Sequence, residues 1–191
     1  MNPAFNYPNL LTFGRIVLTM FFVYLLILGG PRAKFLACVV FFLAGLSDYL
    51  DGMLARRHKT ITSLGKIMDP IADKILILSS FYIFHEVYHL MSGWVFSLVA
   101  FREILITSMR MYWLKRGVVL PAEKTGKIKT ISQMVYVLYV LLGLLITEWT
   151  PRFDVRLHLA HDLMLIWVVF ITLYSALSYR QLFTFRKASN S

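Results

Sequence analysis

Four aspartates lie close together in the sequence as two pairs. Asp48 and Asp51 are three residues apart, and Asp69 and Asp73 are four apart. On a helix, either spacing places both carboxylates of a pair on one face. Carboxylates that converge raise each other's pKa values, and a bound cation removes that penalty. Hard oxygen ligands favour Mg²⁺ or Mn²⁺, and four of them could hold one or two ions, which suits displacement at phosphorus.

The residues around the two pairs leave space and supply positive charge. Gly52 lets a backbone or a substrate approach closely, and Ala55 keeps the same side open one turn later. Arg56 offers a planar fork for a phosphate. Gly65 lies four residues before the second pair, where a bulky side chain would block entry. Each residue alone has an ordinary structural explanation, so only the combination indicates a site.

The pairs stand at the ends of apolar segments that must position them. Of 191 residues, 58% are apolar and 16% charged, so polar surface cannot cover a soluble globule of this size. We therefore predict an all-α, polytopic membrane protein, a six-transmembrane-helix bundle that forms one domain over residues 1–191. A spanning helix needs about 20 mostly apolar residues. The segments are 10–28, 35–48, 70–84, 94–113, 130–146 and 163–182, and Pro70 suits the first turn of the third helix.

The distribution of basic residues predicts the orientation. The net charge is +10, and Lys and Arg gather between the second and third segments, between the fourth and fifth, and in the tail. The positive-inside rule then places both termini and these connections on the cytoplasmic side of a bacterial-type membrane. The two aspartate pairs end neighbouring antiparallel helices on that side, so a site facing the cytoplasm is expected. No basic motif interleaved with aromatic residues argues for nucleic acid.

Together these residues resemble the signature of the CDP-alcohol phosphotransferase family. The pattern is Asp48-x2-Asp51-Gly52-x2-Ala55-Arg56-x8-Gly65-x3-Asp69-x3-Asp73, and all eight fixed positions and spacings agree. The resemblance implies that a CDP-activated donor is joined to an alcohol, that CMP is released, and that a divalent metal is used. It implies that the first three aspartates are metal ligands, and that Asp73 is a further ligand or the catalytic base that takes the proton of the attacking hydroxyl. Residues implied in the CDP pocket are Gly52, Ala55, Arg56, Thr62 and Gly65.

The sequences that flank the signature resemble the bacterial phosphatidylglycerophosphate synthases within that family. The resemblance covers Pro8-Asn9-Leu10-Leu11-Thr12 with Arg15, Arg102-Glu103-Ile104, and Gly126-Lys127-Ile128-Lys129-Thr130. It implies transfer of a phosphatidyl group from CDP-diacylglycerol to sn-glycerol 3-phosphate, beside membrane lipids, and a homodimer is a family expectation. Asn9 and Thr12 could contact the cytidine, although a helix cap is an equal alternative.

The phosphate of the acceptor needs cationic partners. Arg110, Lys127, Lys129 and Arg180 all fall near the predicted cytoplasmic side and could ring that phosphate. Each could instead be a cation that snorkels to the interface. Arg102 with Glu103 lies deeper, where a buried charge pair that positions helices is as plausible as a ligand contact.

Three other functions would use parts of the same sequence. His85-Glu86-Val87-Tyr88-His89 matches the zinc-protease pattern H-E-x-x-H, but it falls about 24 Å from Asp69 along one helix and has no obvious third ligand. A divalent-cation transporter could use the four aspartates, yet it has no need for the arginine or the glycines. The same family chemistry with another acceptor, namely phosphatidylglycerol (a cardiolipin synthase), inositol phosphate or serine, is the main alternative.

Overall fold

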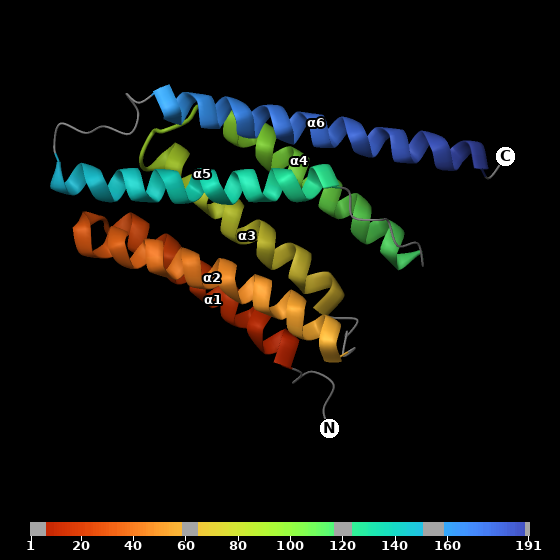
Figure 1. Ribbon diagram of the computed structural model, residues 1–191, viewed down its shortest axis with the longest axis horizontal. Coiled ribbons are helices and arrows are strands. Elements are labelled where there is room, and N and C mark those ends of the chain that lie inside the picture. Colours follow the sequence, from red (N-terminus) through yellow and green to blue (C-terminus); the bar gives the residue numbers. More distant parts are fainter. Residues whose placement is uncertain (1–6, 59–64, 117–123, 151–158, 190–191) are drawn as a thin grey trace. The chain divides into compact units, whose positions relative to one another are not determined.

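The computed structural model describes residues 7–58, 65–116, 124–150 and 159–189, and within them it consists of helices joined by short turns, with no strand (Figure 1). Side chains are described for 13–47, 71–72, 74–114, 116, 125–150 and 159–177. Every predicted apolar segment lies inside one helix, which confirms the all-helical prediction for this part of the chain. The helices are α1 (Tyr7–Leu28), α2 (Gly30–His58), α3 (Gly65–Glu86), α4 (Gly93–Lys115), α5 (Lys124–Trp149) and α6 (Leu159–Ser189).

Helix length and composition identify a membrane protein. Three stretches are long and apolar enough to cross a bilayer, and a fourth, shorter apolar stretch covers most of α1. The three are Gly30–Ser47, Thr125–Trp149 and Leu159–Leu177, and the shorter one is Phe13–Leu28. Exposed large apolar side chains cover these helices, as expected for surfaces that meet lipid rather than water.

One predicted helix start is wrong. Pro70 was expected in the first turn of the third helix, but α3 begins at Gly65, five residues earlier. A proline at this depth removes one backbone hydrogen bond. The helix nevertheless includes it, so the second aspartate pair lies within α3 and not at its cap.

The chain forms two compact units, and the first comprises Met1–Leu90 with Leu141–Asp154. In this unit α1 packs against both α2 and α3. Phe22 and Phe41 meet in its core, with their ring centroids 5.7 Å apart. Gly29 and Gly30 join α1 to α2 with φ of 70° and 79°, a left-handed conformation that glycine adopts without strain. The tight turn sets α1 and α2 side by side.

A polar tie closes the same end of this first unit. The Tyr88 hydroxyl, in the turn after α3, donates a 2.9 Å hydrogen bond to the Leu26 carbonyl oxygen near the end of α1. The Lys34 ammonium lies 5.5 Å from the Tyr88 ring centroid and pairs with the Glu148 carboxylate at the end of α5. Burial, followed by the charge of Glu148, raises the pKa of Tyr88 above its ordinary value.

The second unit comprises Met91–Val140 and Val155–Ser191. Here α4 packs against α6. Two side-chain hydrogen bonds join α5 to α6: Trp167 Nε1 donates to Ser132 Oγ at 3.0 Å, and the Tyr136 hydroxyl lies 3.1 Å from His161 Nε2. The unit therefore places the cation-bearing helices α4, α5 and α6 together.

Candidate active site

The two aspartate pairs lie within continuous helix. Asp48 and Asp51 are on α2, and Asp69 and Asp73 are on α3. With 3.6 residues per turn, the two positions of each pair share one helix face. Their side chains lie outside the described ones, so the convergence of the four carboxylates stays a prediction. What the backbone establishes is that α1 packs against both helices that carry them.

The remaining signature residues that the structure describes lie on the same two helices. Gly52, Ala55 and Arg56 continue α2 directly after Asp51, and Gly65 is the first residue of α3. Thr62 lies outside the described residues. Asn9 and Thr12 fall in the first two turns of α1, and nothing is described of their side chains.

Arg15 is a buried charged residue on α1, the helix that packs against both α2 and α3. Its side chain is 2% exposed, and the Thr19 hydroxyl donates a 2.8 Å hydrogen bond to its carbonyl oxygen. Arg15 and Asp73 each lie thirteen residues before the last residue of α1 and α3. These helices pack together, and the bond from Tyr88 to Leu26 brings their ends level. Arg15 therefore lies at about the depth of Asp73.

Sequence reasoning gave Arg15 no chemical role. The available signal was a single arginine in an otherwise apolar segment. An ionisable residue at membrane depth is expensive and usually functional, so that interruption deserved a functional interpretation.

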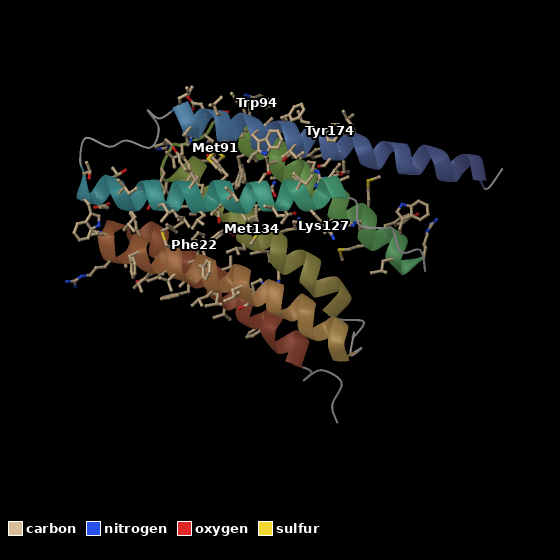
Figure 2. The ribbon with its side chains drawn as sticks, viewed as in Figure 1. Phe22, Met91, Trp94, Lys127, Met134 and Tyr174 are labelled. Atoms are coloured by element: carbon tan, nitrogen blue, oxygen red, sulfur yellow. The ribbon has the colours of Figure 1, made fainter. Side chains whose placement is uncertain are left out.

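The predicted phosphate cations occupy different environments. Arg110 on α4 is exposed, and so is Lys127 on α5, which Figure 2 labels. Lys129, two residues after Lys127, is 1% exposed, because residues two apart lie on opposite sides of a helix. Arg180 is on α6, and its side chain is outside the described ones. The four cations therefore do not form one surface group.

Lys129 belongs instead to a buried polar cluster around Glu103. Glu103 Oε1 pairs with the Lys129 ammonium and accepts a 3.3 Å hydrogen bond from Gln133 Nε2. Arg102 Nη1 lies 3.5 Å from the same oxygen, and Arg102 Nη2 donates a 2.7 Å hydrogen bond to Ser175 Oγ. All five side chains are buried. Of the two interpretations left open for Arg102 and Glu103, the described contacts match a buried charge pair between helices.

The H-E-x-x-H pattern does not form a zinc site in this structure. A zinc helix needs both histidines one turn apart on the same helix. Here α3 ends at Glu86, and His89 follows in a turn with a positive φ of 51°. Among the side chains that the structure describes, no three of His, Cys, Asp or Glu are grouped as a metal site. The four aspartates are outside that set.

Comparison with known proteins covers the part of the chain that carries the signature. Residues 5–174 match the family model described as CDP-alcohol phosphatidyltransferase. A relative from Escherichia coli strain K12 is 33% identical over 181 residues, covering 92% of this chain and 93% of the relative. A relative from Shigella flexneri serotype 5b is 34% identical with the same coverage. Both are named CDP-diacylglycerol–glycerol-3-phosphate 3-phosphatidyltransferase.

Proposed function

Because the chain belongs to the CDP-alcohol phosphatidyltransferase family, we infer that it is an enzyme of phospholipid synthesis. It transfers the phosphatidyl group of CDP-diacylglycerol to sn-glycerol 3-phosphate and releases CMP. One observation carries this assignment: relatives whose name states both substrates match over 92% of the chain. The complete family signature over residues 48–73 supports it.

The reaction exchanges one phosphorus–oxygen bond for another. A hydroxyl oxygen of the acceptor bonds to the phosphatidyl phosphorus, the pyrophosphate bond breaks, and CMP leaves with the bridging oxygen. We propose that Asp73 takes the proton of that hydroxyl or serves as a fourth metal ligand. A carboxylate within hydrogen-bond reach of the hydroxyl would be a competent general base.

A divalent cation fits the donor set that α2 and α3 carry. Four carboxylates are hard oxygen ligands of the kind that Mg²⁺ and Mn²⁺ prefer. We propose that Asp48, Asp51 and Asp69 hold one or two such ions, with Asp73 as ligand or base. When bound, the metal neutralises the pyrophosphate and the charge that develops on departing CMP. The packing of α1 against both acidic helices supports this assembly.

The donor's nucleotide is proposed to lie beside the acidic pairs. Gly52, Ala55 and Arg56 follow the first pair on α2, where small residues leave room and the guanidinium can pair with phosphate. Gly65 would open the other side at the start of α3. Thr62, Asn9 and Thr12 complete the proposed pocket.

The acceptor's phosphate is proposed to bind the cations of α4, α5 and α6. Arg110 and Lys127 are exposed, and Arg180 lies on α6. Lys129, the fourth predicted cation, stays in the proposal with its charge held by Glu103. An acceptor without a phosphate, such as serine, would leave these cations without their phosphate partner.

The membrane arrangement is also a proposal. Six spans, both termini in the cytoplasm and a site that faces it would leave the lipid tails in the bilayer while glycerol 3-phosphate enters from the cytosol. The even number of helices in the described part and the alternation of basic connections support this topology. A single domain over residues 1–191 and a homodimer stay predictions.

A panel of acceptors tests the function directly. Purified protein is given CDP-diacylglycerol, Mg²⁺ and glycerol 3-phosphate, phosphatidylglycerol, inositol phosphate, serine or glycerol, and CMP release is measured. We expect glycerol 3-phosphate to give the fastest release, and to be preferred over serine and glycerol by about a hundredfold or more, because a site built for a phosphate rejects acceptors that lack one. Chelation with EDTA should stop the reaction, and Mg²⁺ or Mn²⁺ should restore it. Preference for another acceptor would reassign the substrate, and no CMP release with any acceptor would refute the function.

A further inference from the structure

The buried carboxylate of Glu103 joins three helices at one point. Its Oε1 atom pairs with Lys129 and lies 3.3 Å from Gln133 Nε2, so it contacts two successive turns of α5. The neighbouring Arg102 links α4 to Ser175 on α6 at 2.7 Å. Ser175 Oγ in turn donates a 3.0 Å hydrogen bond to the Thr172 carbonyl oxygen. One carboxylate and its neighbour therefore fix α4, α5 and α6 to one another.

A buried polar cluster is not needed if its only role is to hold the three helices together. Glu103, Lys129 and Gln133 are each 1% exposed, and Arg102 is 6% exposed. Well-packed apolar side chains of similar volume hold helices at least as firmly as buried ion pairs do. Charged and hydrogen-bonded networks instead impose defined distances and directions. The polarity therefore indicates that a particular geometry of these three helices matters.

Apart from Lys129, which belongs to the cluster itself, each of the three helices carries one proposed phosphate-binding cation near the cluster. Arg110 lies two turns beyond Glu103 on the same face of α4. Lys127 precedes Lys129 by two residues on α5, and Arg180 follows Ser175 by five on α6. All three cations therefore lie within about two turns of the point where the helices are fixed.

We propose that Glu103 is a positioning residue for the acceptor site of this enzyme. Through Lys129, Gln133 and Arg102 it sets the spacing of α4, α5 and α6, and with it the spacing of Arg110, Lys127 and Arg180 around the phosphate of glycerol 3-phosphate. In this arrangement Lys129, as the ion-pair partner of Glu103, helps to set the spacing of the helices. The inference rests on the proposed function and adds to it the residue that organises its acceptor end.

A double-mutant cycle tests the proposal. Glu103→Gln, Lys129→Met and the double variant are compared with wild type for KM and kcat toward each substrate, and for thermal stability. We expect each single change to raise the KM for glycerol 3-phosphate about tenfold and to leave the KM for CDP-diacylglycerol within about twofold. The double variant should be no worse than either single variant, because the two residues act as one unit.

A second ion pair between helices, which is partly exposed, supplies the control. Glu148→Gln breaks the pair with Lys34 in the other compact unit, and both KM values should stay at the wild-type level. If Glu103→Gln does not fold, Lys129→Met and the milder Gln133→Met decide, and the latter should shift the same KM by a smaller factor.

Two results would overturn the proposal. Equal changes in both KM values, or none, would reduce the Glu103 cluster to a scaffold. Effects that multiply in the double variant would mean that Lys129 contacts the phosphate independently of Glu103. Failure of the proposed function is distinguishable, because wild-type protein would then release no CMP with glycerol 3-phosphate.

Discussion

At the scale of single residues, helical spacing distinguishes the four aspartates from the residues of the H-E-x-x-H pattern. The aspartates repeat at helical spacing on α2 and α3, whereas His85 and Glu86 end α3 and His89 follows in a turn. Repetition on one face concentrates charge, and a bound cation makes that concentration favourable. The histidines and Glu86 have no such arrangement and are expected to be dispensable for turnover.

Replacement of Asp69 tests that distinction. Asp69→Asn keeps the side-chain size and removes the charge, so CMP release should fall more than about a hundredfold through loss of metal-assisted stabilisation. Glu86→Gln, on the same helix, is the matched control and should remain within about twofold of wild type. Both are assayed with saturating Mg²⁺ and both substrates. An active Asp69→Asn variant beside an inactive Glu86→Gln variant would remove the aspartates from the centre of the mechanism.

Arg15 offers a second prediction at this scale. Its side chain is buried on α1 at the depth of Asp73. Arg15→Met keeps a long side chain without the charge and should lower kcat about tenfold to a hundredfold, because the acidic helices lose a fixed positive neighbour. Arg15→Lys should recover part of the loss. The exposed Arg32 is the control, and Arg32→Met should leave kcat unchanged. Equal kcat values for Arg15→Met and wild type would contradict the role.

Charged residues could be found from the sequence, but their neutral partners could not. The spacing of the four aspartates and the adjacent pair of Arg102 and Glu103 were visible before any fold was known. Gln133 and Ser175 gave no signal, because a neutral polar residue in an apolar helix has many ordinary explanations. Only the packing of α4, α5 and α6 brings them to the charged pair.

At the scale of helices, apolar segments predicted which helices exist better than where they end. The second segment was expected over 35–48, but α2 continues to His58. A polar continuation of a helix has the same backbone and a different composition, so hydropathy ends where the apolar side chains end. In α2 that continuation is the part that carries Gly52 and Arg56.

The tie at the far end of α1 and α3 gives a prediction about stability. Tyr88→Phe removes the donor to the Leu26 carbonyl oxygen and should lower the free energy of unfolding by about 1 kcal/mol. For a chain of this length that corresponds to a Tm lower by about 2–4 °C, measured by thermal unfolding in detergent. Tyr24→Phe, at an exposed position of α1, is the control and should not shift Tm.

The pH dependence of that tie follows from the raised pKa of Tyr88. The unfolded chain loses the phenolic proton first, near its ordinary pKa of about 10. The contribution of Tyr88 is therefore fully present below that pH and is lost as the pH rises through the higher folded pKa. A difference in Tm between wild type and Tyr88→Phe that is already absent at neutral pH would contradict the hydrogen bond.

At the scale of the whole molecule, charged residues interrupt helices that are otherwise apolar. The three stretches that are long and apolar enough to cross a bilayer lie in α2, α5 and α6. Buried Arg15 interrupts α1, the second aspartate pair lies in α3, and Arg102 with Glu103 lies in α4. Charges inside a bilayer are expensive and persist where they are used. The charges that α1, α3 and α4 carry are thus consistent with a functional role for each of these helices.

The proposed orientation can be tested with single cysteines. The chain has one cysteine, Cys38, and Cys38→Ser provides a cysteine-free background for Ser92→Cys and Ser63→Cys. Ser92 precedes α4, in the connection without basic residues, and Ser63 lies in the basic connection between α2 and α3. By the positive-inside rule, a membrane-impermeant maleimide added to intact spheroplasts should label Ser92→Cys, whereas Ser63→Cys should react only after permeabilisation. The unsubstituted background controls for other reactive groups. The opposite labelling pattern would place the aspartates on the outer side, away from a cytosolic supply of glycerol 3-phosphate.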